Sequence, residues 1–306
     1  MVHLPKTPEY DMETEKSARH DIVTTINYYS DPGDGSTPTP VYVGKDQVTN
    51  KRPMLPVTTT VTDVTGDETS FTLDQNGFQY LKHVSEFAAN EEGGGGGGVE
   101  HEAFADEEKI QREYFAECEG LLRDVTGASR VFAFDHRVRR GPSDWHDIPV
   151  YNVRYRGPLH RAHVDQSYAG AEMVLREKIP NADEVGGLLM QRRWGIVNIW
   201  RPIKPIHKDP LAVCDARTVS DADLVPGSII LKSGQRRESW TVKPNPEHRW
   251  YFKYQQQPDE VVLIKCFDSN SSAEMARRAP HCAVEDLDAK EGEWRESVEV
   301  RCLVFW

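Results

Sequence analysis

From residue 131 onward the chain contains a series of short apolar runs separated by turn residues, and this pattern limits the possible folds most strongly. The runs are rich in β-branched and aromatic residues and are bounded by Gly, Pro, Asn and Asp, which is typical of strands. They predict strands over residues 131–138, 194–200, 228–232, 249–254, 261–267 and 297–306. Helices alternate with them too irregularly for a doubly wound parallel sheet, and no GxGxxG motif follows a strand. The expected fold class is therefore mainly β with flanking helices, as a sandwich or barrel.

Two amphipathic segments are the helices expected beside this β structure. In residues 107–125, Ile110 and Tyr114 belong to an apolar stripe with helical spacing, and Gly127 follows as a stop signal. Residues 167–178 form a second candidate helix, which ends before a proline. We expect both helices to pack on the outside of one sheet.

The first hundred residues differ from the rest of the chain in composition. Threonine and valine alternate through residues 56–62, which predicts a short strand, and residues 93–98 are six consecutive glycines. Because glycine loses the most backbone entropy on ordering, we expect a mobile surface loop or linker there. The predicted organisation is an N-terminal extension (1–105), whose strands and glycine-rich loop pack on the core, followed by the barrel core (106–306).

Charge and cysteine content exclude several classes of function. The chain has 37 Lys and Arg against 49 Asp and Glu, a net charge of −12, which argues against binding to nucleic acid or to an anionic membrane. No apolar run approaches the roughly 18–20 residues that span a bilayer. The five cysteines are scattered and form no CxxC motif, so neither a disulfide framework nor a zinc ribbon is expected. These features predict a cytoplasmic protein.

The motif His163-Val164-Asp165 is the strongest candidate for chemistry. In an extended segment, residues two apart project to the same side, so the imidazole and the carboxylate point together. Two histidines and one carboxylate on one face of an octahedral iron leave three positions open, as in the non-haem Fe(II) oxygenases. His281, which follows the apolar run 261–267, is the candidate for the second histidine. His160 would point to the opposite face, so we expect a structural or surface role for it.

A second pair of residues suits the binding of a carboxylate. Arg295 and Ser297 share one face at the start of the last predicted strand, where a guanidinium fork and a hydroxyl can bind one carboxylate together. A buried arginine in an apolar barrel needs an anionic partner, and a dicarboxylate cosubstrate would supply one. Arg301 has the same strand parity and is the alternative anchor.

These motifs, in this order, resemble those of the 2-oxoglutarate-dependent Fe(II) dioxygenases on the double-stranded β-helix (jelly-roll) fold. More narrowly, the chain resembles the fungal hydroxylase/desaturase group of secondary-metabolite clusters, which is related to a subunit of the bacterial cephalosporin 7α-methoxylase. The resemblance runs from about residue 131 to 305 and is carried by the blocks VFAFDHRVRR, HRAHVDQSYAGA, WGIVNIWRPI, DPLAVCDARTV, EHRWYFKYQQQPDEVVLIKCFDS, APHCAV and RESVEVRCLVF.

The resemblance implies the roles of the motif residues. His163, Asp165 and His281 would hold Fe(II), and Arg295 with Ser297 would hold the distal carboxylate of 2-oxoglutarate, with O2 as the other cosubstrate. Similar proteins hydroxylate, desaturate or close rings, so the family does not choose among these reactions.

Further candidates come from strand faces near these motifs. Asn198 either satisfies a backbone group or contacts the cosubstrate, since a buried amide must be hydrogen-bonded. The candidates for substrate contact are Arg193, Arg201, Tyr168, Trp200 and His248, with surface ion pairing or core packing as the alternative for each. His136 is expected in the core, and Arg137, Arg139 and Arg140 are expected at a solvated strand end.

The leading interpretation is an Fe(II)/2-oxoglutarate oxygenase that oxidises a small, amino-acid-derived molecule in fungal secondary metabolism, as a monomer or homodimer. One alternative is an iron-binding jelly-roll oxygenase that does not use 2-oxoglutarate. The other is an accessory subunit of an oxygenase complex. The intact HxD, His and RxS set argues against a subunit without catalytic function.

Overall fold

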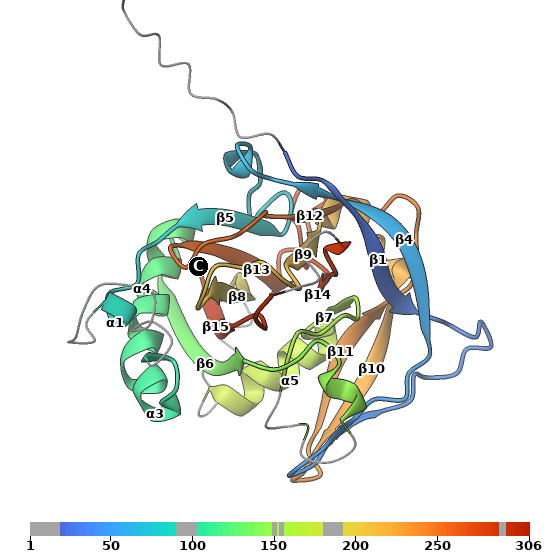
Figure 1. The fold of residues 1–306 in the computed structure, drawn as a ribbon. Coiled ribbons are helices and arrows are strands. Elements are labelled where there is room, and N and C mark those ends of the chain that lie inside the picture. The colour runs from blue at the N-terminus through green and yellow to red at the C-terminus, as the bar shows by residue number, and fades with distance from the viewer. Residues whose placement is uncertain (1–18, 90–102, 149–151, 153–155, 180–191, 288–291) are drawn as a thin grey trace, which may run out of the picture.

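The structure of the chain is a computed structural model, which describes residues 19–89, 103–148, 152, 156–179, 192–287 and 292–306. The glycine run at 93–98 lies outside the described residues. Within these ranges the strands form a ten-stranded sheet, in the order β1-β4-β12-β9-β14-β7-β11-β10-β2-β3, and a five-stranded sheet, in the order β5-β13-β8-β15-β6. Apolar side chains of both sheets share a buried interior, which gives the double-stranded β-helix arrangement (Figure 1).

The larger sheet contains β1 (Ile22–Tyr29), β2 (Val41–Val43), β3 (Val48–Thr49), β4 (Met54–Asp63), β7 (His163–Val164), β9 (Leu211–Cys214), β10 (Leu224–Leu231), β11 (Arg236–Val242), β12 (Trp250–Phe252) and β14 (His281–Ala283). The smaller sheet contains β5 (Phe78–Lys82), β6 (Arg130–Arg139), β8 (Trp194–Pro202), β13 (Glu260–Asp268) and β15 (Ser297–Phe305). All the strands expected from the apolar runs are present.

The strands before residue 106 are part of both sheets. β1 and β4 form an antiparallel pair, and β4 continues the larger sheet by pairing in parallel with β12. β5 pairs with β13 at the edge of the smaller sheet. The described part of the N-terminal region therefore completes the sheets, and the strand expected at 56–62 lies within β4.

The helix expected over 107–125 is present as one helical stretch. It consists of α3 (Glu107–Lys109), a π-helical turn (Ile110–Tyr114) and α4 (Phe115–Thr126). The Asp106 side chain accepts hydrogen bonds from two N–H groups of the first turn, and Gly127 ends the helix with a left-handed φ of 65°. Apolar residues of this stretch pack on β8 and β15 side chains that point away from the barrel interior.

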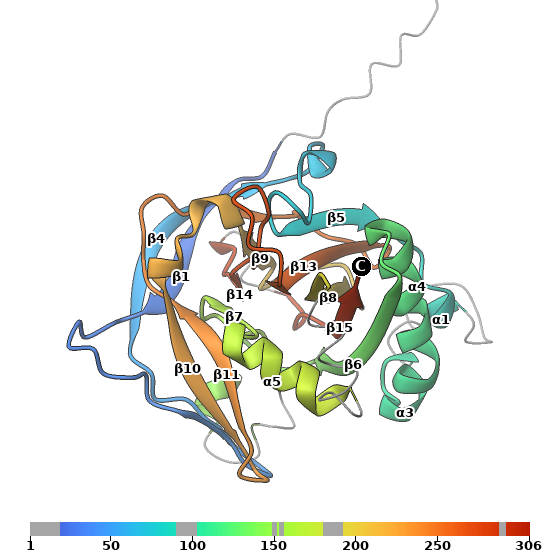
Figure 2. The same cartoon turned by 180° about the vertical axis from the view of Figure 1, so that it is seen from behind.

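The second helix corrects one expectation. α5 (Tyr168–Lys178) begins after Ser167, whose side chain caps it, but it does not lie on the outside of the same sheet. Val174 and Leu175 pack with residues such as Ile196 and Leu303 on the interior face of the smaller sheet. α5 thus covers one end of the space between the sheets, between β6 and β11 (Figure 2).

The remaining helical segments with described bounds are short: α1 (Glu86–Ala89) and single 3-10 turns at Glu68–Ser70, Trp145–Asp147, Ala216–Thr218 and Asp221–Asp223. None of the helices in the described ranges combines the length and apolar character that a membrane crossing requires.

Candidate metal centre

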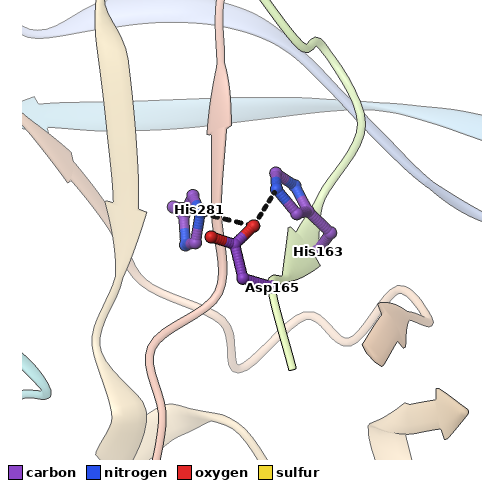
Figure 3. Close-up of side chains that lie close together, drawn as sticks. All are labelled: His163, Asp165 and His281. Atoms are coloured by element: carbon purple, nitrogen blue, oxygen red, sulfur yellow. Dashed lines mark ion pairs between the residues drawn. The ribbon is translucent and has the colours of Figure 1, made fainter. Parts of the chain in front are cut away.

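Two neighbouring strands of the larger sheet bring the motif histidines together. β7 and β14 pair antiparallel, with His163 and His281 directly opposite each other, and the centres of their rings are 4.5 Å apart. Asp165 follows His163 by two positions and points to the same side, so all three side chains converge (Figure 3). Their potential ligand atoms lie within 4.8 Å of one another. The juxtaposition expected from the sequence is present.

Hydrogen bonds to backbone carbonyls fix how the two imidazoles are oriented. Nδ1 of His163 lies 2.8 Å from the carbonyl oxygen of Arg161, and Nδ1 of His281 lies 3.2 Å from that of Ala279. Because a carbonyl only accepts, each Nδ1 carries the proton and each Nε2 keeps a free lone pair. The two Nε2 atoms lie 3.4 Å and 4.0 Å from Oδ1 of Asp165.

The environment favours the protonation states that metal ligands need. Burial, and then the neighbouring His163, lower the pKa of His281 to about 4, so this imidazole is neutral at ordinary pH. Burial alone would raise the pKa of Asp165, but Arg301 and the two histidines outweigh it and hold that pKa well below its usual range. A neutral His281 imidazole and an ionised Asp165 carboxylate are thus available together beside His163.

One buried atom in the cluster lacks a partner. Nε2 of His281 is inaccessible to solvent and has no hydrogen bond in the described structure. A buried polar atom without a partner is costly unless a ligand satisfies it. The residues therefore fit a metal ion, and this donor set suits ferrous iron, although zinc, cobalt and nickel would also bind it.

Asn198 and Arg301 both contact Asp165 and therefore lie beside the candidate metal ligands. Asn198 Nδ2 and Arg301 Nε each lie 2.8 Å from Oδ2 of Asp165, which leaves Oδ1 facing the imidazoles. Arg301 also pairs with Asp135 at 2.8 Å and Glu299 at 2.7 Å. Asn198 thus supports a metal ligand, while its Oδ1 is buried without a hydrogen-bond partner. Arg301 pairs with three carboxylates, which does not favour it as the alternative anchor for the cosubstrate.

Arg295 is the buried arginine expected from the RxS motif. Its side chain lies over Trp200, with 5.4 Å from Cζ to the ring centre, and Nη1 donates to the carbonyl oxygen of Asp209 at 2.7 Å. Nε is buried without a hydrogen-bond partner, and none of the described carboxylates forms an ion pair with this guanidinium. Burial, followed by the like charge of Arg139, lowers the pKa of Arg295 to about 9. Ser297 is buried at the start of β15.

Two arginines expected near the substrate lie elsewhere. Arg201 is on the other face of β8 from Asn198, where it donates to the Tyr114 hydroxyl at 2.8 Å and to two backbone carbonyls at 2.7 Å. Arg193 pairs with Asp268 at 2.7 Å and lies over the Trp306 ring. Both guanidinium groups are occupied by the protein, so neither is retained as a substrate contact.

The other substrate candidates also lie outside the metal cluster. The Tyr168 hydroxyl donates to Asp221 at 2.9 Å, and Trp200 lies in the core beneath Arg295. His248 lies 3.1 Å from the Tyr28 hydroxyl and 3.2 Å from Asp223. Tyr28 lines the cavity beside the metal cluster, whereas His248 contacts Tyr28 and is not among the cavity residues.

A group of cavity residues was not expected from the sequence. A cavity of about 230 Å³ adjoins His163 and Asp165. Arg137 and Arg139 line it, because pairing with β15 places them opposite Glu299 and Ser297. The expectation of a solvated strand end was wrong for these two residues. The sequence did contain one signal: Arg137 and Arg139 are two residues apart in a predicted strand, so they share one face of it.

Known proteins resemble this chain over most of its length. A family model described as an oxidoreductase/YMDC permease-like domain matches residues 26–305. The hydroxylase/desaturase efuI of Hormonema carpetanum is 34% identical, over 93% of this chain and 95% of its own length. The alpha-ketoglutarate-dependent dioxygenase phiK of a fungal species is 33% identical, over 77% of this chain and 80% of its own length.

A solved structure supports the fold. The iron and alpha-ketoglutarate-dependent endoperoxidase NvfI superposes with a TM-score of 0.74 and 24% identity, over 93% of this chain and 98% of that chain. The shared architecture is the jelly roll. From the extent of these matches, the chain belongs to the fungal hydroxylase/desaturase group of the Fe(II)/2-oxoglutarate-dependent dioxygenase family.

Proposed function

We propose that this chain is an oxygenase that binds Fe(II) through His163, Asp165 and His281 and oxidises a small molecule at the expense of 2-oxoglutarate and O2. The observation that carries the proposal is the convergence of two Nδ1-protonated imidazoles and an ionised carboxylate on one point, with Nε2 of His281 buried and unsatisfied. The reaction belongs to fungal secondary metabolism and takes the form of hydroxylation, desaturation or ring closure.

Iron bound in this cluster supplies reductive activation of O2, coupled to the conversion of 2-oxoglutarate into succinate and CO2. The protein's own part is to hold the ligands. Asn198 and Arg301 orient Asp165 from behind, and the backbone carbonyls of Arg161 and Ala279 orient the imidazoles. Outer contacts of this kind typically change metal affinity by about 10–100-fold when they are removed.

The distal carboxylate of 2-oxoglutarate is assigned to Arg295, with Ser297 in support. A guanidinium that is 4% exposed, with an unsatisfied Nε and no described ion-pair partner, is a site for an anion. Its planar fork matches a carboxylate. The substrate is a small molecule. Arg193 and Arg201 bond to protein groups instead, so they give no support for an amino-acid-derived substrate.

The test is anaerobic loading of the purified chain with Fe(II) and 2-oxoglutarate, followed by addition of O2. We expect binding of 2-oxoglutarate to the iron-loaded protein by calorimetry and slow formation of succinate even without substrate. Iron binding without succinate would favour the jelly-roll oxygenase that does not use 2-oxoglutarate. Activity only after addition of a partner protein would favour the accessory subunit.

Assembly and location complete the proposal. We propose a monomer or homodimer acting in the cytoplasm. Light scattering during size-exclusion chromatography tests the first part, and imaging of the tagged protein in its fungal host tests the second.

A further inference from the structure

The cavity beside the metal cluster has a charge opposite to that of the whole protein. The net charge of the chain is −12, yet the cavity is lined by Arg52, Arg137, Arg139, Arg156 and Arg161. Within the ranges that the structure describes, none of these five guanidinium groups forms an ion pair with a carboxylate. The nearby carboxylates of Asp135 and Glu299 both pair with Arg301, which also lines the cavity.

Three of the arginines form one group on the side of β6. Arg137 and Arg139 share a face of that strand, and Arg156 lies close enough for their charges to act on it. Burial, followed by the like charges of Arg137 and Arg139, lowers the pKa of Arg156 to about 10. Nε of Arg156 is buried without a hydrogen-bond partner, and among the described residues Arg139 donates to the carbonyl oxygen of Gly157, at 2.9 Å.

The other two arginines form a second group. Arg52 donates to the carbonyl oxygens of Thr39 and Ser228, at 2.9 Å and 2.7 Å, which satisfies hydrogen bonds but leaves its charge unpaired. Arg161 reaches backbone oxygens only at 3.5 Å, which is too long for a strong hydrogen bond. Burial, followed by the charge of Arg161, lowers the pKa of Arg52 to about 10.

Apolar side chains complete the lining. Val41, Val43, Met54 and Ile229 face the same cavity. Gathering unpaired cations in a partly buried space is costly unless a ligand compensates them. The occupant must therefore combine an apolar body with a negative charge for each of the two arginine groups.

We propose that the substrate of this site is a dicarboxylic acid with an apolar body. One carboxylate is bound by Arg137, Arg139 and Arg156, and the other by Arg52 and Arg161. This inference rests on the proposed function, because it places the substrate beside the metal ligands. 2-Oxoglutarate does not meet the same description, because it is a short, polar dianion and its anchor Arg295 is not among the cavity residues.

The experiment measures binding without catalysis. Isothermal titration calorimetry on the purified full chain, freed of metal, compares 2-hexylsuccinate with octanoate and with the dimethyl ester of hexylsuccinate. Since each charge-assisted guanidinium–carboxylate contact is worth roughly a tenfold change in affinity or more, the dicarboxylate should bind at least about tenfold more tightly than the monoacid. The ester should bind more weakly than either acid.

Variants assign the two carboxylates to the two arginine groups. Arg156→Gln and Arg161→Gln should each weaken hexylsuccinate binding about tenfold, and the double variant about a hundredfold, because the two groups act on different carboxylates. Arg161→Lys keeps the charge and should restore part of the loss. The matched control is Arg112→Gln, an exposed arginine on the π-helical turn, which should leave binding unchanged. Circular dichroism confirms that each variant is folded.

Three results would overturn the proposal. The first is equal affinity for the dicarboxylate, the monoacid and the ester, and the second is a loss of hexylsuccinate affinity in only one of the two single variants. The third is loss of 2-oxoglutarate binding in Arg156→Gln, which would make the cavity the cosubstrate site. Succinate formation by the iron-loaded protein is measured separately. Succinate without a preference for the diacid refutes this inference alone, and a preference for the diacid without succinate refutes the proposed function alone.

Discussion

Replacing Arg295 with alanine should raise the KM for 2-oxoglutarate by roughly 30-fold or more, because truncating one partner of a buried charge pair costs about 2–5 kcal/mol. The guanidinium is buried over Trp200 and uses Nη1 on the carbonyl oxygen of Asp209, while Nε has no partner. The KM of Arg295→Lys should lie between those of the unchanged protein and Arg295→Ala, since lysine keeps the charge and loses the planar fork.

The assay is the initial rate of succinate formation as a function of 2-oxoglutarate concentration, with calorimetric binding as a second measurement. A stability control separates this role from a structural one. Because no described carboxylate pairs with Arg295 and its guanidinium donates to one carbonyl oxygen, whereas that of Arg201 has at least three acceptors, Arg295→Ala should lower the melting temperature of the 2-oxoglutarate-free protein less than Arg201→Ala does. If the role of Arg295 were structural, Arg295→Ala would instead lower the melting temperature strongly.

An Arg295→Ala protein with an unchanged 2-oxoglutarate dependence would refute the assignment. If Arg301→Ala raised the KM for 2-oxoglutarate instead, the role would transfer to Arg301, against its observed contacts with three carboxylates. If neither substitution changed the dependence, the case for 2-oxoglutarate itself would fail.

Four further outcomes are expected. His281→Ala should lose bound iron and retain its circular dichroism spectrum; full iron occupancy by elemental analysis would require a different third ligand. Arg301→Gln should lower iron affinity about 10–100-fold in a chelator titration, because Asp165 loses its Nε donor; unchanged affinity would show that Asn198 suffices. Arg201→Ala should lower the free energy of unfolding in urea by about 3 kcal/mol or more, since it leaves buried partners unpaired, while the KM for 2-oxoglutarate stays the same. Removing residues 1–105 should prevent folding by exposing unpaired edges of both sheets, so a protease-resistant fragment would contradict the shared role of β1, β4 and β5.

The strands and the metal ligands were accessible from the sequence because they depend on local patterns. Apolar runs locate β8, β13 and β15, and the two-residue period of a strand places His163 and Asp165 on one side. The same period predicts that Cys282 points away from His281, and it packs in the core with Ala212 and Cys214. The distant histidine needed the motif order, since nothing local to it indicates a metal.

The polar residues of β8 could not be assigned because that strand is buried on both faces. Asn198 and Arg201 have opposite parity, so at most one of them faces the metal cluster, but hydrophobicity does not tell the two faces apart. Which of the two residues faces the metal cluster depends on which face of β8 is covered by α4. That is decided by tertiary packing and not by the local sequence. Arg201 points to that side and bonds to Tyr114.

The arginines of the cavity were hidden for a similar reason. A basic stretch at the end of a predicted strand is most often solvated, and only its partner strand decides whether it faces water or the interior. In β6 that partner is β15, far away in the sequence. Arg52 and Arg161 add to the cavity from two further segments, so no single stretch of sequence contains the charge cluster.

The position of β15 in the smaller sheet has a consequence for the order of folding. β15 lies between β8 and β6, and no other strand of the described residues joins these two. The α4–β6 unit is local in sequence and can form early, whereas insertion of β15 requires closure of long loops and is expected to be slow. Arg301 and Ser297 belong to this strand, so Asp165 gains its contact with Arg301 only at that step. A kinetic intermediate that lacked β15 would therefore have the two histidines on β7 and β14 and still bind iron weakly.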